Sequence, residues 1–199
     1  MHAVARPQHR TPEIGSSLRT EQKAGCVRNF YSNPESALRR AVNWGKWDEV
    51  QLALRDNADP NTRDKEGATM LMLAGRRGHI QIAELLLQNG ANIDARGKMG
   101  WTALMEAAAT NHPETAELLI NWGASLDVQD YVFGRTALIW AMWVGNVPTA
   151  KLLLQHGADF EIEGKSCRTA FKWTISAKVA NEISDFCLGK SAPAKAQWQ

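Results

Sequence analysis

The fold is decided by residues 67–95, which read GATMLMLAGRRGHIQIAELLLQNGANIDA. Two later stretches share its pattern: residues 100–128 read GWTALMEAAATNHPETAELLINWGASLDV, and residues 134–162 read GRTALIWAMWVGNVPTAKLLLQHGADFEI. Their first glycines follow one another at intervals of 33 and 34 residues, and the glycines near their ends (Gly90, Gly123 and Gly157) keep the same two intervals. Two markers in one register indicate a repeat array.

Each copy predicts two short helices followed by a loop. In the copy that begins at Gly100, Thr102 is placed to cap the first helix and Leu104 lies on its apolar face. Pro113 starts the second helix, and Gly123 ends it in the left-handed conformation. Helix pairs without shared loops would form a bundle. The repeated loop chemistry instead favours stacked copies that bury their leucines against one another, an all-α solenoid.

These residues resemble the ankyrin repeat, whose pattern runs G-x-T-P-L-H-x-A-A-x-x-G-H and then V-x-x-L-L-x-x-G-A-D. The resemblance covers residues 34–189 and includes Gly78-His79 and the Gly-Ala pairs that begin at Gly90, Gly123 and Gly157. It implies an ankyrin-type α-solenoid of about five helix-turn-helix repeats joined by hairpin loops. The predicted repeats are residues 34–64, 65–97, 98–130, 131–164 and 165–189.

Two departures from the family pattern have structural consequences. The family's Pro-Leu-His is replaced in every copy, for example by Met70-Leu71-Met72. The histidine hydrogen-bond ladder that usually links the hairpins should therefore be missing, and we expect a less stable array of the same fold. One extra residue within 130–134 lengthens one loop by one.

Charge is divided unevenly along the 199 residues, although the net charge is only +2. Residues 1–33 carry +3 and residues 190–199 carry +2, which leaves −3 on residues 34–189. We predict a flexible basic N-terminal arm and a C-terminal tail; the arm is either a solvated segment or a clamp on an acidic partner. A nearly balanced total argues against nucleic-acid binding.

The sequence predicts no enzyme, metal site or cofactor. It has no dinucleotide-binding glycine motif, P-loop or nucleophile elbow. The three cysteines (Cys26, Cys167 and Cys187) are widely spaced and indicate a reduced chain. His79 and His112 occupy the turn between paired helices, where a structural role is expected. Without an apolar leader or a run of eighteen apolar residues, we expect a cytoplasmic chain that does not enter membranes.

The resemblance also implies where a partner binds: on the concave side, made of the hairpin tips and the exposed face of each first helix. Transferred to this chain, the predicted partner-binding residues are Trp44, Lys65, Glu66, Arg76, Arg77, Lys98, Met99, Trp101, Thr110, Tyr131, Val132, Phe133, Arg135, Trp143, Val144 and Arg168. Their centre is apolar and their rim is rich in arginine, which is the composition of a binding hot spot. Trp140 and Trp173 are predicted to pack the stack instead.

We therefore predict a non-enzymatic protein–protein interaction module that is a monomer by itself, either an adaptor or an inhibitor or effector that occludes its target. The alternative is a structural subunit or assembly factor of a larger complex, with arm and tail ordered by its neighbours.

Overall fold

The computed structural model describes residues 33–166, 169–173 and 177–189. The helices of these described residues all lie within the unit formed by residues 34–199. They form five pairs in chain order: α2 (Pro34–Trp44) with α3 (Trp47–Arg55), α4 (Met70–Arg77) with α5 (Ile80–Gln88), α6 (Ala103–Ala109) with α7 (Pro113–Asn121), α8 (Ala137–Val144) with α9 (Val147–Gln155), and α10 (Ala170–Trp173) with α11 (Ala177–Gly189).

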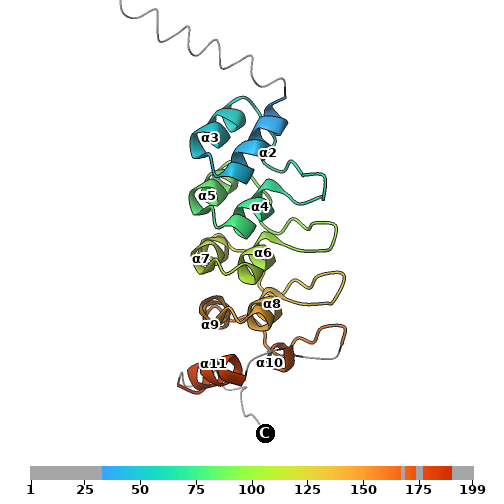
Figure 1. Cartoon of the computed structure of the whole chain (residues 1–199), viewed down its shortest axis with the longest axis vertical. Helices are drawn as coiled ribbons and strands as arrows, with labels where there is room; N and C mark the ends of the chain where they lie inside the picture. The colour runs from blue at the N-terminus through green and yellow to red at the C-terminus, as the bar shows by residue number, and fades with distance from the viewer. Residues whose placement is uncertain (1–32, 167–168, 174–176, 190–199) are drawn as a thin grey trace, which may run out of the picture. The chain divides into compact units, whose positions relative to one another are not determined.

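The pairs stack into two parallel columns of helices. Helices α2, α4, α6, α8 and α10 form one column, each in contact with the next, and we call them the inner helices. Helices α3, α5, α7, α9 and α11 form the second column in the same way, and these are the outer helices. The long loops between the pairs project beside the inner helices (Figure 1). The predicted all-α solenoid of stacked helix pairs is confirmed.

Threonine side chains begin three of the inner helices, as the sequence predicts. The hydroxyls of Thr69, Thr102 and Thr136 each accept a hydrogen bond of 3.3 Å from the amide three residues later. This bond satisfies one of the amides that the first turn of a helix leaves without a partner. The left-handed turns after the outer helices are also present, with φ of 63° at Asn57 and 86° at Gly90 and Gly123.

Leucines that recur once per repeat build the core. The inner helices contribute Leu38, Leu71, Leu104 and Leu138, and the outer helices Leu86, Leu119 and Leu153, all less than 2% exposed. Because every inner and outer helix contacts the matching helix of the next pair, the burial of these leucines depends on the stacking of the repeats.

A ladder of long polar side chains links the hairpins where the histidine ladder was expected to be missing. The Arg63 guanidinium donates to the carbonyls of Gly67 (2.7 Å) and Arg96 (2.8 Å). One repeat later, the Arg96 guanidinium donates to the Gln129 carbonyl, and the Gln129 side-chain amide donates to the backbone carbonyl of Glu163 (2.9 Å). The links therefore come from a different position of the repeat, which the sequence analysis did not single out.

The two histidines of the helix turns pack against glycines of the preceding repeat. A Cβ built on Gly45 would lie 2.8 Å from His79, and one on Gly78 would lie 2.4 Å from His112. Burial, followed by the nearby charges of Arg77 and His112, holds the pKa of His79 below its ordinary value. These contacts agree with the structural role predicted for both histidines.

Candidate partner-binding surface

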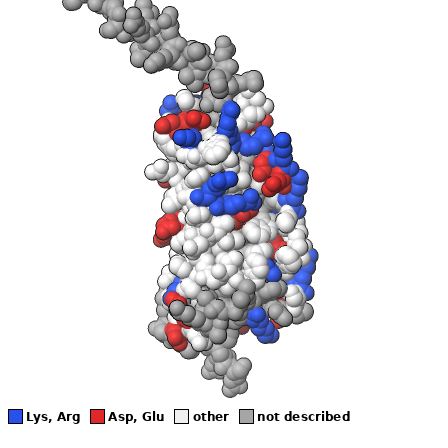
Figure 2. Space-filling view, viewed as in Figure 1, with Lys and Arg blue, Asp and Glu red and all other residues white. Residues whose placement is uncertain are grey.

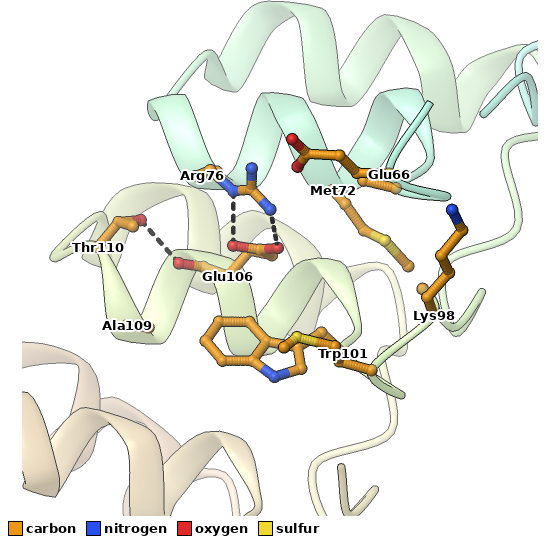
Figure 3. A pocket seen from close by; sticks show the side chains of 11 residues that line it. Glu66, Met72, Arg76, Lys98, Trp101, Glu106, Ala109 and Thr110 are labelled. Atoms are coloured by element: carbon orange, nitrogen blue, oxygen red, sulfur yellow. Dashed lines mark hydrogen bonds and ion pairs between the residues drawn. The ribbon is translucent and has the colours of Figure 1, made fainter. Parts of the chain in front are cut away.

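The side formed by the hairpin tips and the inner helices, which the family pattern predicts to be concave and which we call the concave side, contains a pocket of about 530 Å³ between α4 and α6 (Figure 3). We call it the central pocket. It brings together six of the predicted residues, Glu66, Arg76, Lys98, Met99, Trp101 and Thr110, with Ala68, Met72, Gly97, Glu106 and Ala109. Residues from two neighbouring repeats thus enclose one space, as expected for the concave side.

An ion pair forms one wall of the central pocket. Arg76 donates two hydrogen bonds to Glu106, of 2.9 and 2.6 Å, and Figure 3 shows the two side chains facing each other from α4 and α6. Glu106 is only 4% exposed. The hydrogen bond to Glu106 raises the pKa of Arg76, and burial partly opposes that effect. Arg76 was predicted to belong to the arginine-rich rim of the partner-binding surface, and its charge is paired with Glu106 within the chain.

The other walls of the central pocket are apolar or bear amphipathic side chains. Met72 is buried behind it, and Trp101 is half-buried beside it. The Thr110 hydroxyl donates to the Glu106 carbonyl at 2.7 Å, and the Lys98 ammonium donates to the Lys65 carbonyl at 3.0 Å. The pocket can accept a large apolar side chain, because an aromatic wall and a methionine offer area while the nearby charges are largely paired.

A second concave pocket of about 340 Å³ lies one repeat earlier, between α2 and α4; we call it the arginine pocket. It is lined by Ser36, Arg39, Arg40, Asn43, Trp44, Asp64 and Leu73. Four of these lie 33 residues before central-pocket residues: Arg39 before Met72, Asn43 before Arg76, Asp64 before Gly97, and Leu73 before Glu106. The two pockets are therefore the same feature of successive repeats with different chemistry.

Arg39 and Arg40 were missed by the sequence analysis, which selected Trp44 from this helix. Trp44 is 70% exposed. Arg39 lies one period before Met72, which was not among the predicted residues, so the register of the repeat does not lead from a predicted residue to Arg39.

The third interval of the concave side is filled by aromatic side chains. Trp140, in the register position of Glu106, is 6% exposed, and its ring centroid lies 4.4 Å from Trp101, 5.3 Å from Trp143 and 6.4 Å from Phe133. We call these four residues the aromatic cluster. The packing role predicted for Trp140 is confirmed. Trp101 and Trp143 were predicted as contact residues, and they are half-buried against it.

Arg135 lies inside the aromatic cluster and not on an exposed rim as predicted. Its guanidinium carbon lies 4.4 to 4.6 Å from the ring centroids of Phe133, Trp140 and Trp143, and the residue is 5% exposed. Burial lowers the pKa of Arg135, while the charge of Asp130 raises it. Cation–π contacts and a nearby carboxylate compensate for the loss of water around this guanidinium.

Asp130 organises the loop that carries the extra residue. Its carboxylate accepts hydrogen bonds from the amides of Val132 (2.9 Å), Phe133 (2.6 Å) and Arg135 (3.2 Å), and from the Trp140 indole (3.1 Å). One buried side chain thus fixes both the loop and the centre of the aromatic cluster.

The longer loop presents apolar side chains to solvent. Met99 and Tyr131 are 54% and 53% exposed, and Val132 and Phe133 also belong to the exposed group. The Arg96 guanidinium, which the sequence analysis did not select, lies 4.1 Å from the Tyr131 ring centroid. Exposed apolar side chains gathered at neighbouring hairpin tips are typical of an interaction surface.

The remaining predicted residues lie at the margins. Lys65 is exposed, and Arg77 is exposed and donates to the Asn43 side chain at 2.8 Å. Val144 is exposed at the end of α8. Arg168 lies outside the described residues, as do the predicted arm and tail; nothing beyond the backbone is described for Trp173 and Cys187.

Comparison with known families agrees with this architecture. The chain matches the family of ankyrin repeats (3 copies) over residues 2–130 and 95–164. It belongs to the ankyrin repeat family. Ankyrin repeats generally mediate protein–protein interaction, and the family is typically non-enzymatic. No curated protein matches the chain.

Two further observations concern the described residues of this ankyrin repeat protein. Within the described ranges, no group of three or more His, Cys, Asp or Glu side chains could hold a metal ion. In the same part of the chain, no helix combines the length and the apolar character that crossing a membrane requires.

Proposed function

We propose that this ankyrin repeat protein is a non-enzymatic binding module that holds a protein partner on its concave side, as an adaptor or as an inhibitor that occludes its target. The observation that carries the proposal is the row formed by the arginine pocket, the central pocket and the aromatic cluster along successive inner helices. Two open pockets next to a rigid aromatic wall suit a partner segment that crosses several repeats.

The exposed hairpin-tip residues support the same function. Met99, Tyr131 and Val132 lie beside the central pocket or the aromatic cluster, and their apolar side chains are exposed. Exposing this apolar area does not stabilise a monomer. A partner that covered them would gain the free energy of that buried area.

Affinity capture from a native lysate with the full-length chain tests this function. The first variant combines Met99→Ser, Tyr131→Ser and Val132→Ser, which removes exposed apolar groups and leaves the buried Trp140 in place. The matched control combines Leu52→Ser, Ile80→Ser and Trp122→Ser, which are also exposed apolar residues but belong to the outer helices and their ends. Urea unfolding of each variant checks that the fold is retained.

We expect wild type and the outer variant to capture the same dominant protein and the concave variant to lose it. Each true anchor should contribute about 2 kcal/mol to binding. Capture that survives in the concave variant and fails in the outer variant would move the binding surface to the outer helices.

The alternative function, a structural subunit or assembly factor, is distinguished by gel filtration of the isolated chain. An adaptor elutes as a monomer, whereas an obligate subunit without its neighbours self-associates or aggregates.

A further inference from the structure

Resting on the proposed function, we propose that the concave groove binds an acidic segment of the partner, with a carboxylate in the arginine pocket and a large apolar side chain in the central pocket. The proposal concerns the chemical class of the partner segment, which the ankyrin fold leaves open.

Charge is distributed unevenly between the two columns of helices. Within their bounds, the inner helices carry two acidic residues and five basic ones, Arg39, Arg40, Arg76, Arg77 and Lys172. The outer helices carry seven acidic residues and three basic ones. Residues 34–189, whose net charge is −3, thus carry a net charge of +3 on the inner helices and −4 on the outer helices. Figure 2, whose view includes both columns and the hairpin loops, shows groups of Lys and Arg side chains with Asp and Glu side chains beside them, above a largely uncharged area.

The arginine pocket has arginine side chains from two inner helices in or beside its lining. Arg39 and Arg40 line it from α2, and Arg77 reaches the lining residue Asn43. The Arg39 Nε is buried and has no hydrogen-bond partner within the described ranges. Asp64 also lines the pocket, but its Oδ1 accepts the amides of Glu66 (2.9 Å) and Ala68 (2.8 Å).

These groups favour an anion as the occupant of the arginine pocket. The Arg77 guanidinium meets a neutral amide oxygen and not a carboxylate, so its charge is not neutralised by that hydrogen bond. A carboxylate entering here would form charge-assisted hydrogen bonds, which are stronger than those between neutral groups.

The central pocket differs from the arginine pocket in the charge of its lining. There Arg76 is already paired with Glu106, and Glu66 and Lys98 bring charges of opposite sign, so the lining residues carry no net charge. The apolar atoms of Met99 and Trp101 remain available. An anion therefore gains more in the arginine pocket, and an apolar group gains more in the central pocket.

One short segment can reach both pockets. They belong to successive repeats, and packed helices lie about 8–10 Å apart. An extended chain advances about 3.3 Å per residue, so three residues span that distance.

Two other occupants fit the charges less well. Residues 1–33 carry +3, and the inner helices repel a segment of the same sign. A second copy could place its acidic outer helices on the basic inner ones. That contact would be heterologous, because it joins two different surfaces. It would therefore produce open-ended oligomers unless the geometry closed a ring.

The test is a selection with a phage-displayed library of random 12-residue peptides on the immobilised full-length chain. Selected peptides are synthesised with a fluorophore, and binding is measured by anisotropy. The test variant combines Arg39→Met and Arg77→Met, which remove the charge and keep the aliphatic stem. The matched control combines Lys46→Met and Arg55→Met, outside the inner helices. The concave apolar variant described above is measured in parallel, and urea unfolding confirms that all variants fold.

We expect the selected peptides to combine Asp or Glu with a large apolar residue. Their affinity should fall about tenfold in the Arg39→Met/Arg77→Met variant, should fall similarly when the peptide acids become Asn or Gln, and should stay unchanged in the control.

The other outcomes separate this inference from the proposed function. One outcome overturns the acidic segment and leaves concave binding intact. In it, the selected peptides lack acidic residues or bind the Arg39→Met/Arg77→Met variant as tightly as wild type, and they do not bind the concave apolar variant. If the peptides bind both concave variants as tightly as wild type, or if the selection enriches no peptide, the acidic segment and the concave site are overturned together. Analytical ultracentrifugation tests for a second copy as the occupant. If the mass of wild type rises with concentration while the Arg39→Met/Arg77→Met variant stays monomeric, a second copy is the occupant and the proposal is overturned.

Discussion

Replacing Asp130 by asparagine should destabilise this protein far more than the same substitution at Asp64, although both side chains organise a hairpin loop. Asp130 is 2% exposed and accepts four hydrogen bonds, distributed over both of its oxygens. Asp64 is less buried, and both of its hydrogen bonds go to one oxygen, Oδ1. Asparagine can reproduce the arrangement at Asp64 but not the one at Asp130.

The magnitude follows from the donors that the change leaves without an acceptor. If the asparagine oxygen keeps the amides of Val132 and Phe133, its NH₂ group faces the Arg135 amide and the Trp140 indole, two buried donors. Each buried donor without a partner costs about 1–3 kcal/mol, so the substitution should cost about 4 kcal/mol. Loss of the carboxylate charge beside the buried Arg135 adds to this cost. For Asp64→Asn we expect a loss of about 1 kcal/mol or less.

Equilibrium unfolding in urea measures both values, with tryptophan fluorescence reporting on the aromatic cluster and far-ultraviolet circular dichroism on the helices. A fluorescence transition that moves to lower urea in Asp130→Asn would show that the cluster loses its support. The reasoning is refuted if Asp130→Asn stays within about 1 kcal/mol of wild type, or if Asp64→Asn costs as much.

Three further changes test other parts of the array. Gly78→Ala should lower the urea midpoint more than Gly90→Ala: both positions have positive φ, which costs about 1–2 kcal/mol, but only at Gly78 would the new Cβ lie 2.4 Å from His112. Burial lowers the pKa of His79, so the folded state resists its protonation and stability should fall as the pH drops below about 6.5. His79→Gln should reduce that pH dependence in thermal unfolding, and an unchanged slope would assign it to other groups. Arg63→Met removes two hydrogen bonds between and within hairpins and should cost about 1–3 kcal/mol, with faster hydrogen exchange in the hairpin loops; exchange that stays slow would show that the ladder does not hold them.

The fold could be predicted from the sequence because its determinants are local and repeated. A threonine at the start of a helix and a glycine or asparagine after one have the same conformational effect in every copy, and the period connects the copies. The helix boundaries at Thr102, Pro113 and Gly123 needed no knowledge of tertiary contacts.

The concave side was predicted less completely because its chemistry depends on contacts between repeats. Arg76 has the exposed position that the family pattern assigns to it, yet its charge is neutralised by Glu106, a residue 30 positions later. Arg135 is buried because three rings surround it, and that arrangement follows from the packing of Trp140. A repeat pattern gives the position of a side chain on the helix but not its partner from the next repeat.

The recurrence of the concave pocket at one-repeat spacing gives this surface a modular length. The arginine pocket and the central pocket are successive copies, and the aromatic cluster closes the row at the third. Inserting another copy of a pocket-forming repeat before the cluster would lengthen the groove by one unit without altering either existing pocket. The number of repeats between α2 and Trp140 would then set how long a bound segment can be, independently of the chemistry that selects its side chains.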